Sequence, residues 1–270
     1  MKISIIGLGV VGNAMYNSFL IKSENTEYII YGYDKYKNGG IGRLEDCVDS
    51  DIIITALPTL FDESINGFNH SATYEVLDKL NELYYNKIII IKSTVEPEFT
   101  EKISNKYVNI SFIHNPEFLF SKTSFDDFHN QKYIILGKTS NCSDNNLNIV
   151  KQMYELLYND GKQYICTSNE SECMKLGYNT FCSVKIQYFN ELYLLCNKID
   201  CDFEKVKELM FLTGYIKESH TQVPGTDGQM SFGGACLPKD CKALLSYMKD
   251  NNISCEVLES CVSEMKKMRN

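Results

Sequence analysis

The chain has 270 residues, of which 44% are hydrophobic and 23% charged, a balance typical of folded globular proteins rather than disordered ones. The net charge of −8 argues against a nucleic-acid partner, and the longest aliphatic runs fall far short of the roughly 18 residues of a membrane span. The 11 cysteines include no Cys-x-x-Cys pair, and the N-terminus has no signal-peptide pattern. We therefore expect a cytoplasmic protein with reduced thiols, no metal, and no nucleic-acid or membrane partner.

Short β-branched runs alternate with helical stretches through the first half of the chain. Continuous apolar runs predict buried strands at residues 2–6, 28–33, 51–55, 87–91, 109–113 and 133–137. Helical spacing between them predicts helices at 11–21, 71–85 and 97–105. The alternation is typical of an α/β fold, with an N-terminal doubly wound parallel (Rossmann) sheet.

The pattern changes after residue 146. A helix at 147–158 and an edge strand at 164–166 complete the first domain, which we place at residues 1–165. Residues 166–270 are expected to form an all-helical domain, with helices at 169–197, 203–212, 239–250 and 253–267. Residues 213–238 hold five of the 16 glycines and two of the five prolines. A stretch of that length without periodicity predicts a functional loop.

A glycine-rich turn follows the first predicted strand and opens the first helix, with the sequence Gly7-Leu8-Gly9-Val10-Val11-Gly12. Such a turn lets a pyrophosphate approach the backbone at a helix N-terminus. Asp34 ends the second strand, where its carboxylate would bind an adenosine ribose and repel a 2′-phosphate, which favours NAD over NADP. Lys35 and Lys37 soften that preference, and a glycine turn without a ligand is the alternative.

Polar clusters follow two further strands. They are Lys92-Ser93-Thr94-Val95 and His114-Asn115-Pro116-Glu117-Phe118-Leu119. Doubly wound sheets keep their ligands at such strand ends, so these groups could orient a substrate or a water. Taken separately, each cluster also fits a turn or a cap.

Two features of the helical half carry reactive groups. Lys175 and Asn179 are four residues apart and share one helix face, where a lysine would otherwise be a solvated surface charge. Cys236 precedes a predicted helix N-terminus beside Lys239, a setting that favours thiolate, and we expect it to be a nucleophile. The other ten cysteines are expected to be small core residues.

Together these motifs resemble the UDP-glucose/GDP-mannose dehydrogenase family, most closely its UDP-glucose 6-dehydrogenase branch. The matching pieces occur in the family's order: the glycine turn, Lys-Ser-Thr-Val at 92–95, Asn-Pro-Glu-Phe-Leu at 115–119, Lys-Leu-Gly-Tyr-Asn-Thr-Phe at 175–181, Ser-His-Thr-Gln-Val-Pro-Gly-Thr-Asp-Gly at 219–228 and Phe-Gly-Gly-Ala-Cys-Leu-Pro-Lys-Asp at 232–240. The last piece is highly specific, and the likeness covers nearly the whole chain.

The resemblance implies oxidation of a sugar C6 alcohol to a carboxylate, with NAD as the cofactor and a nucleotide sugar, such as UDP-glucose, as the substrate. Cys236 would form a thiohemiacetal and then a thioester. Lys175 and Asn179 would stabilise the oxygen at C6, and Asp240, with Glu117 and Thr94, would position the water. The implied cofactor-binding residues are Gly7, Leu8, Gly9, Val10, Val11, Gly12, Asp34, Lys35, Pro58, Thr59, Ser93, Thr94 and Ser121. The implied substrate-binding residues are Glu117, Phe118, Leu119, Lys175, Asn179, Asp227, Phe232 and Gly233.

The chain also departs from the family pattern. Tyr215 stands where an arginine is common, Ser121 where many members have a glutamate, and Phe120 where a small or basic residue is usual. Family members carry a third domain that binds the nucleotide, so we expect these 270 residues alone to oxidise the sugar slowly. The resemblance further implies a homodimer built on the helix at 169–197.

Two other functions remain open at this point. A β-hydroxyacid dehydrogenase also joins a dinucleotide domain to a helical domain with a Lys-x-x-x-Asn pair, but it has no need of the motif at 232–240. The other is an NAD-binding remnant without catalysis, against which the retention of Lys175, Asn179, Cys236 and Asp240 argues.

Overall fold

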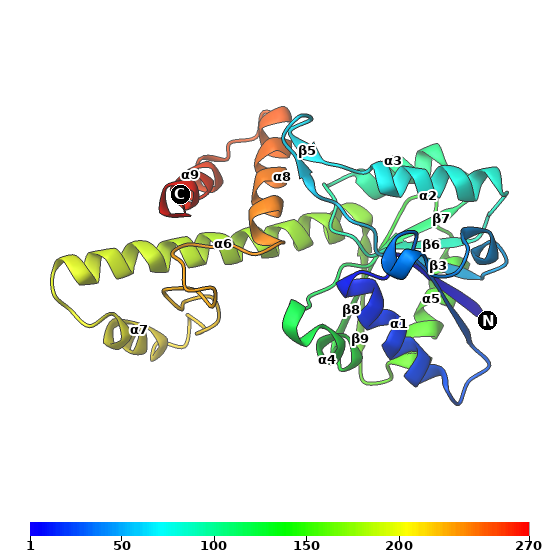
Figure 1. Ribbon diagram of the computed structural model, residues 1–270, viewed down its shortest axis with the longest axis horizontal. Coiled ribbons are helices and arrows are strands. Elements are labelled where there is room, and N and C mark those ends of the chain that lie inside the picture. Colours follow the sequence, from blue (N-terminus) through cyan, green and yellow to red (C-terminus); the bar gives the residue numbers. More distant parts are fainter. Residues whose placement is uncertain (270) are drawn as a thin grey trace. The chain divides into compact units, whose positions relative to one another are not determined.

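The computed structural model describes residues 1–269 (Figure 1). They form two compact units. The first comprises Met1–Leu60 and Phe68–Lys175, and the second comprises Phe61–Gly67 and the described residues from Leu176 onward. A compact unit and a domain need not divide at the same residue, so the domain boundary after residue 165 stays a prediction.

The first unit is built on a seven-stranded sheet with the strand order β2-β1-β3-β6-β7-β8-β9. Its strands are β1 (Lys2–Ile6), β2 (Ile29–Tyr33), β3 (Ile52–Thr55), β6 (Ile88–Ile91), β7 (Ser111–His114), β8 (Tyr133–Lys138) and β9 (Lys162–Thr167). Every predicted strand is confirmed, with ends that differ by no more than two residues.

The predicted doubly wound parallel sheet is confirmed, except that one pair of neighbouring strands is antiparallel. β7 and β8 are antiparallel, with Ile113 opposite Lys138, while β8 and β9 are parallel to each other. The connection between β7 and β8 contains only the short turn η3 (Ser121–Thr123) and the six-residue helix α4 (Ser124–His129). A buried strand has the same apolar composition in either direction, so the sequence of residues 133–137 could not reveal its orientation.

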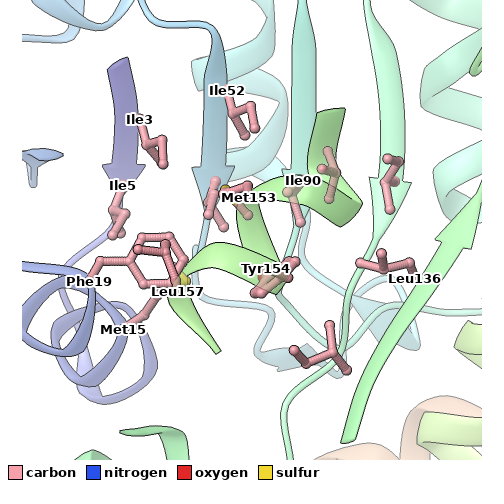
Figure 2. Close-up of a cluster of buried hydrophobic side chains, with 14 of the residues drawn as sticks. Ile3, Ile5, Met15, Phe19, Ile52, Ile90, Leu136, Met153, Tyr154 and Leu157 are labelled. Carbon is pink, nitrogen blue, oxygen red and sulfur yellow. The ribbon is translucent and has the colours of Figure 1, made fainter. Parts of the chain in front are cut away.

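Helices cover both faces of the sheet because each central strand is apolar on both sides. Ile52 and Ile54 of β3 pack in a cluster with α1 (Val10–Ser23) and α5 (Asp144–Leu157). Ile53 points to the other face, in a cluster with α2 (Ser71–Glu82) and α3 (Phe99–Lys106). Figure 2 shows part of the first cluster, in which the labelled side chains are Ile3, Ile5, Met15, Phe19, Ile52, Ile90, Leu136, Met153, Tyr154 and Leu157.

The second unit is mainly helical, as predicted. Helix α6 (Ser168–Lys198) is followed by α7 (Phe203–Phe211), α8 (Leu237–Asp250) and α9 (Glu256–Arg269). Residues 213–236, all within the described chain, form neither helix nor strand, as expected for the loop. Two apolar clusters hold the unit together, one around Phe232 between α8 and α9 and one around Phe189 of α6 and Phe203 of α7.

A hairpin of β4 (Phe61–Asp62) and β5 (Gly67–Phe68) was not predicted. Its tip belongs to the second unit, where Asn66 Nδ2 donates to Ser246 Oγ at 2.6 Å and the Lys242 ammonium lies 2.5 Å from Glu63. Strands of two residues are too short to carry a period-two pattern, so the sequence gives no signal for them.

The expectation that the ten cysteines other than Cys236 lie in the core is wrong for four of them. Six of the ten assigned to the core are buried, namely Cys47, Cys142, Cys182, Cys196, Cys241 and Cys261. Cys166 and Cys255 are partly exposed, and Cys173 and Cys201 are exposed. Helix α6 exposes one of its faces at Cys173, and Cys201 lies beyond the end of the same helix, so neither position is enclosed by packing.

Candidate functional site

The glycine turn at residues 7–12 joins β1 to α1. Gly7 has a φ of +87°, and a Cβ there would lie 2.6 Å from the Ala56 carbonyl oxygen. A Cβ on Gly12 would lie 1.8 Å from the Gly7 carbonyl oxygen, whereas a Cβ on Gly9 would have no neighbour within 4 Å. Gly7 and Gly12 therefore shape the turn, and Gly9 leaves open space in which a phosphate can approach the backbone.

Asp34 lies directly after β2, and its carboxylate is held by backbone donors. Its Oδ2 accepts from Leu8 N at 2.7 Å, and its Oδ1 accepts from Tyr36 N at 2.9 Å and Lys37 N at 2.8 Å. Burial alone would raise the pKa of this carboxyl, but these N–H donors hold it below its ordinary value. The turn thus carries a fixed anion where the dinucleotide fingerprint needs a ribose acceptor.

The two lysines after Asp34 differ in position. Lys37 Nζ donates to Leu8 O and to Asn13 Oδ1, both at 2.8 Å, so its charge lies at the glycine turn. Lys35 instead pairs with Glu75 at 2.5 Å. Only Lys37 is therefore placed to offset the charge of Asp34 at this turn.

The segments that follow β3 and β6 are joined by side-chain hydrogen bonds. Thr59 Oγ1 donates to Thr94 O at 2.8 Å, and Ser93 Oγ donates to Leu57 O at 2.7 Å. Pro58 lies between Leu57 and Thr59, the two residues of this segment that form these hydrogen bonds. The structure thus brings four of the predicted cofactor-binding residues together at neighbouring strand ends.

A buried lysine follows β6, and sequence reasoning gave it no role. Lys92 Nζ donates to Asn115 Oδ1 at 2.8 Å, and the Tyr154 hydroxyl donates to the same oxygen at 2.6 Å. Asn115 Nδ2 donates to Ile135 O at 2.6 Å. Burial lowers the pKa of Lys92 to about 7. The network fixes the start of the Asn-Pro-Glu segment, and the only signal for it was a lysine directly after four isoleucines.

His114 ties the end of β7 to the start of α6. Its Nδ1 lies 2.7 Å from Ser171 Oγ, and its Nε2 lies 3.3 Å from Ser93 O. Because a carbonyl can only accept, Nε2 carries the proton and Nδ1 accepts from the Ser171 hydroxyl. Burial lowers the pKa of His114 to about 3, so the ring is neutral and serves to position Ser93.

Lys175 and Glu117, two predicted catalytic residues, lie together in the first unit. The Lys175 ammonium donates to Glu117 O and lies 3.4 Å from Glu117 Oε1 and 5.0 Å from the centre of the Phe118 ring. Glu117 Oε2 accepts from Leu119 N at 2.6 Å. Both charged side chains are largely buried, so their interaction is weakly screened by solvent.

Ser121, the remaining predicted cofactor residue, opens the η3 turn and is exposed. The neighbouring Phe120 is also exposed, and its backbone N–H donates to Asp127 Oδ2 at 2.9 Å. Among residues 1–269, no hydrogen bond links Ser121 to the strand-end residues Pro58, Thr59, Ser93 and Thr94.

The second unit brings Asn179 and Asp240 together. Asp240 is fully buried in the first turn of α8, where its Oδ2 accepts from Asn179 Nδ2 at 2.6 Å and its Oδ1 lies 2.5 Å from the Lys239 ammonium. Asp240 N donates to the carbonyl of Cys236 at 3.0 Å. Cys236 is the exposed N-cap residue of α8, as predicted, so its thiol lies at the positive end of the helix dipole.

Side chains of α6 and α9 form hydrogen bonds with the loop before Cys236. Ser231, with a φ of +61°, donates from its N–H to Asn190 Oδ1 at 2.8 Å and from its Oγ to Gln187 Oε1 at 2.6 Å, both on α6. Arg269 of α9 donates to Asp227 Oδ2 at 2.8 Å and to Ser231 O at 3.1 Å.

Gly233 and Phe232 also have definite neighbours. A Cβ on Gly233 would lie 2.3 Å from an Arg269 nitrogen, and Phe232 is buried in the apolar cluster of α8 and α9. Asp227 is thus paired with a cation of its own chain, and Phe232 lies in the core. Sequence reasoning missed Arg269, for which no motif gave a signal.

No helix within residues 1–269 is both long and apolar enough to cross a membrane. The same described residues contain no group of His, Cys, Asp and Glu side chains that could hold a metal ion.

Comparison with known proteins gives the family. Residues 43–158 match the NAD-binding domain of the UDP-glucose/GDP-mannose dehydrogenase family, and residues 169–265 match its central domain. The chain belongs to this family. The expectation of NAD as the cofactor is confirmed by the first match.

Individual relatives show how much of a longer protein the chain covers. It is 33% identical to a UDP-glucose 6-dehydrogenase of Rickettsia bellii over 73% of this chain, and it spans 45% of that protein's length. It shares its fold with a UDP-glucose dehydrogenase of Pyrobaculum islandicum, with a TM-score of 0.84 and 20% identity over 98% of this chain and 68% of that one.

A member of the alternative class has the same fold. The chain aligns with a 3-hydroxyisobutyrate dehydrogenase of Mycobacterium tuberculosis with a TM-score of 0.75 and 15% identity, over 98% of this chain and 92% of that one. The fold alone therefore does not decide between the two chemistries.

Proposed function

We propose that the protein is an NAD-dependent nucleotide-sugar 6-dehydrogenase that oxidises UDP-glucose, or a related nucleotide sugar, to the uronate. The observation that carries the proposal is the start of α8, where Cys236 occupies the N-cap position and buried Asp240 is held by Asn179 and Lys239. An exposed thiol at a helix N-terminus with a fixed carboxylate one turn away suits covalent capture of an aldehyde and later attack by water.

The glycine turn fits the adenosine end of NAD. The open position at Gly9 and the Asp34 carboxylate supply a pyrophosphate approach and a ribose acceptor. When bound, NAD⁺ supplies the hydride acceptor, and two such oxidations are needed to convert an alcohol to a carboxylate.

Each catalytic residue receives a role that its surroundings support. Cys236 adds to the aldehyde carbon to give a thiohemiacetal, and loss of a hydride turns this into a thioester. Water then cleaves the thioester, which releases the carboxylate and restores the thiol. Asp240 orients that water or accepts its proton, and the amide of Asn179 holds the carboxylate in place.

Lys175 and Glu117 serve the reacting oxygen. The buried ammonium of Lys175, fixed by Glu117, stabilises negative charge that develops on the C6 oxygen. Thr94, tied to Thr59, belongs to the strand-end segment that we assign to the cofactor and the water. Ser93, Pro58, Ser121 and the loop residues Asp227 and Gly233 remain proposed binding residues.

The proposal is tested by measuring how many NADH molecules form for each substrate molecule consumed. Purified protein is mixed with NAD⁺ and, in turn, with UDP-glucose, GDP-mannose and UDP-N-acetyl sugars, and NADH is followed by its absorbance. We expect two NADH for each sugar consumed. One NADH from a 3-hydroxy acid, with none from any sugar, would favour the β-hydroxyacid dehydrogenase. Binding of NAD⁺ without turnover of either class would favour a non-catalytic NAD-binding protein.

We also propose that the protein is a homodimer formed along α6. Phe181, Tyr188 and Leu195 recur every seven residues on this helix and are 67%, 56% and 53% exposed. A heptad-spaced apolar stripe on a helix surface is the pattern that a second helix covers.

The proposed location is the cytoplasm. The 11 cysteines all lie within residues 1–269 and are not paired in disulfides there, which suits a reducing compartment. Fractionation of cells that express the tagged protein tests this, and recovery from an oxidising compartment would contradict it.

A further inference from the structure

The end of α6 brings two cysteines together. α6 ends at Lys198, and the backbone N–H of Cys201 donates to the carbonyl of Cys196 at 3.0 Å. Asp200, between them, has a φ of +58°. A hydrogen bond from the third residue after a helix back to the carbonyl five residues earlier, with a left-handed residue just before the donor, defines a Schellman motif.

This motif determines which side chains meet. The residue that donates the closing N–H and the residue that accepts it pack against each other in Schellman motifs, and here both are cysteines. The Cys201 thiol is close enough to raise the pKa of the Cys196 thiol. Cys196 is 2% exposed and lies in the apolar cluster with Phe189 and Phe203, whereas Cys201 faces solvent. One thiol is therefore accessible, and the turn places its buried neighbour beside it.

We propose that Cys196 and Cys201 form an oxidisable dithiol, which a low-molecular-weight disulfide such as glutathione disulfide converts into an intramolecular disulfide across the end of α6. The inference does not depend on the proposed dehydrogenase activity. It concerns a different part of the second unit's sequence from Cys236.

The chemistry is two successive thiol–disulfide exchanges. The Cys201 thiol loses its proton to solvent, and the thiolate attacks one sulfur of glutathione disulfide, which breaks the S–S bond and releases one glutathione. The Cys196 thiol then loses its proton and attacks the Cys201 sulfur of the mixed disulfide, which releases a second glutathione. Two protein thiols are oxidised to one disulfide while one glutathione disulfide is reduced to two thiols.

The order of the two steps follows from exposure. Burial, and then the neighbouring Cys201 thiol, raise the pKa of the Cys196 thiol, so this thiol is a poor first nucleophile. Cys201 is the entry point, and Cys196 is the resolving thiol.

The chain offers a direct readout because Lys198 separates the two cysteines. Trypsin cleaves after Lys185, Lys198 and Lys205, which places Cys196 and Cys201 in separate peptides, 186–198 and 199–205. The reduced, folded protein is incubated with glutathione disulfide, free thiols are alkylated, and the protein is digested without reductant. We expect mass spectrometry to show these two peptides joined through a disulfide.

Matched variants separate the two steps. Cys196→Ser should stop at a glutathione adduct on Cys201, and Cys201→Ser should leave Cys196 reduced and protected from alkylation until the protein is unfolded. Because Cys201 is exposed, the second variant tests the proposal even where the first fails to fold.

Unfolded protein in urea serves as the reference for rate. The folded turn should form the joined peptides at least about tenfold faster than the unfolded chain, since it holds the thiols together. A stable glutathione adduct on Cys201 of the unaltered folded protein, or equal rates in the folded and unfolded chains, would overturn the proposal.

Discussion

Asp34 joins the two segments that make up the adenosine end of the cofactor site. Its carboxylate accepts backbone hydrogen bonds from Leu8 on the glycine turn and from Tyr36 and Lys37 after β2. The same group is an acceptor for ribose hydroxyls and repels a 2′-phosphate, whereas Lys37 at the turn attracts one. Cofactor preference is thus a balance between one anion and one cation a few residues apart.

Replacing Asp34 by Ala should weaken NAD⁺ binding by about 10- to 100-fold, because hydrogen bonds to a charged group are worth about 1.5–3 kcal/mol. The preference for NAD⁺ over NADP⁺ should shrink or reverse in the same variant. Calorimetric titration with both cofactors measures this. Tighter binding of NADP⁺ than NAD⁺ by the unaltered protein would remove the argument. Lys79→Ala, which breaks an exposed ion pair with Glu82 on α2, is the control.

Single residues show where sequence reasoning was sufficient and where it failed. Motif spacing predicted that Asp240 and Cys236 share a helix start, because four residues of one chain fix that relation. The Lys92–Asn115–Tyr154 network joins residues 62 positions apart and depends on how α5 packs on the sheet. No local pattern encodes such a contact, and the same holds for Arg269 and Asp227.

At the scale of elements, the turn between β1 and α1 allows a matched pair of substitutions. Gly9→Ala should leave the melting temperature almost unchanged and weaken NAD⁺ binding, because its Cβ enters open space beside the backbone. Gly12→Ala should destabilise the protein, because its Cβ would lie 1.8 Å from the Gly7 carbonyl. Thermal melts and cofactor titrations of both variants check this. Equal melting temperatures for the two would contradict the assigned roles.

The junction of α3 and α6 makes stability depend on pH through Glu172. Its Oε1 accepts from Thr100 N at 2.8 Å and from the Thr100 hydroxyl, while its buried Oε2 has no hydrogen-bond partner among residues 1–269. Burial raises the pKa of Glu172 to about 7, although the bonds from Thr100 oppose this. The unfolded chain releases this proton near pH 4.5, whereas the folded protein keeps it until about pH 7. Glu172 therefore lowers stability as pH rises through this window, and the loss is complete above it.

Glu172→Gln should remove that penalty. Relative to the unaltered protein, its free energy of unfolding should rise by on the order of 3 kcal/mol between pH 4.5 and pH 8. Denaturant unfolding at several pH values measures the difference, with Glu155→Gln on the exposed part of α5 as the control. A difference that does not change with pH would show that Glu172 is ionised in the folded protein.

The sequence predicted the positions of most helices and strands. It did not predict the direction of one strand or the presence of two very short strands. Apolar runs located the central strands β1, β3, β6 and β7 because burial on both faces imposes composition. The same runs could not show that β8 is antiparallel to β7, since strand direction depends on the connection. The β4–β5 hairpin carried no signal, because its strands have only two residues each.

At the scale of the whole molecule, the proposed dimer depends on the apolar stripe of α6. Tyr188→Glu together with Leu195→Glu should convert a dimer into a monomer at micromolar concentration, because two charges would enter the buried seam. Asn197→Glu, an exposed position on a different side of the helix, is the control and should leave the dimer intact. Light scattering coupled to size exclusion measures the mass. A monomeric unaltered protein would contradict the proposed interface.

The central claim is that Cys236 carries the sugar through the second oxidation. The most direct test is the ratio of NADH to uronate with UDP-glucose, measured for the unaltered protein and for Cys236→Ser at equal cofactor occupancy. The account predicts two NADH per uronate for the unaltered protein. For the variant it predicts normal NAD⁺ binding and little or no uronate, because a serine hydroxyl has no ready anion to capture the aldehyde. Uronate formation by Cys236→Ser at the rate of the unaltered protein would contradict it.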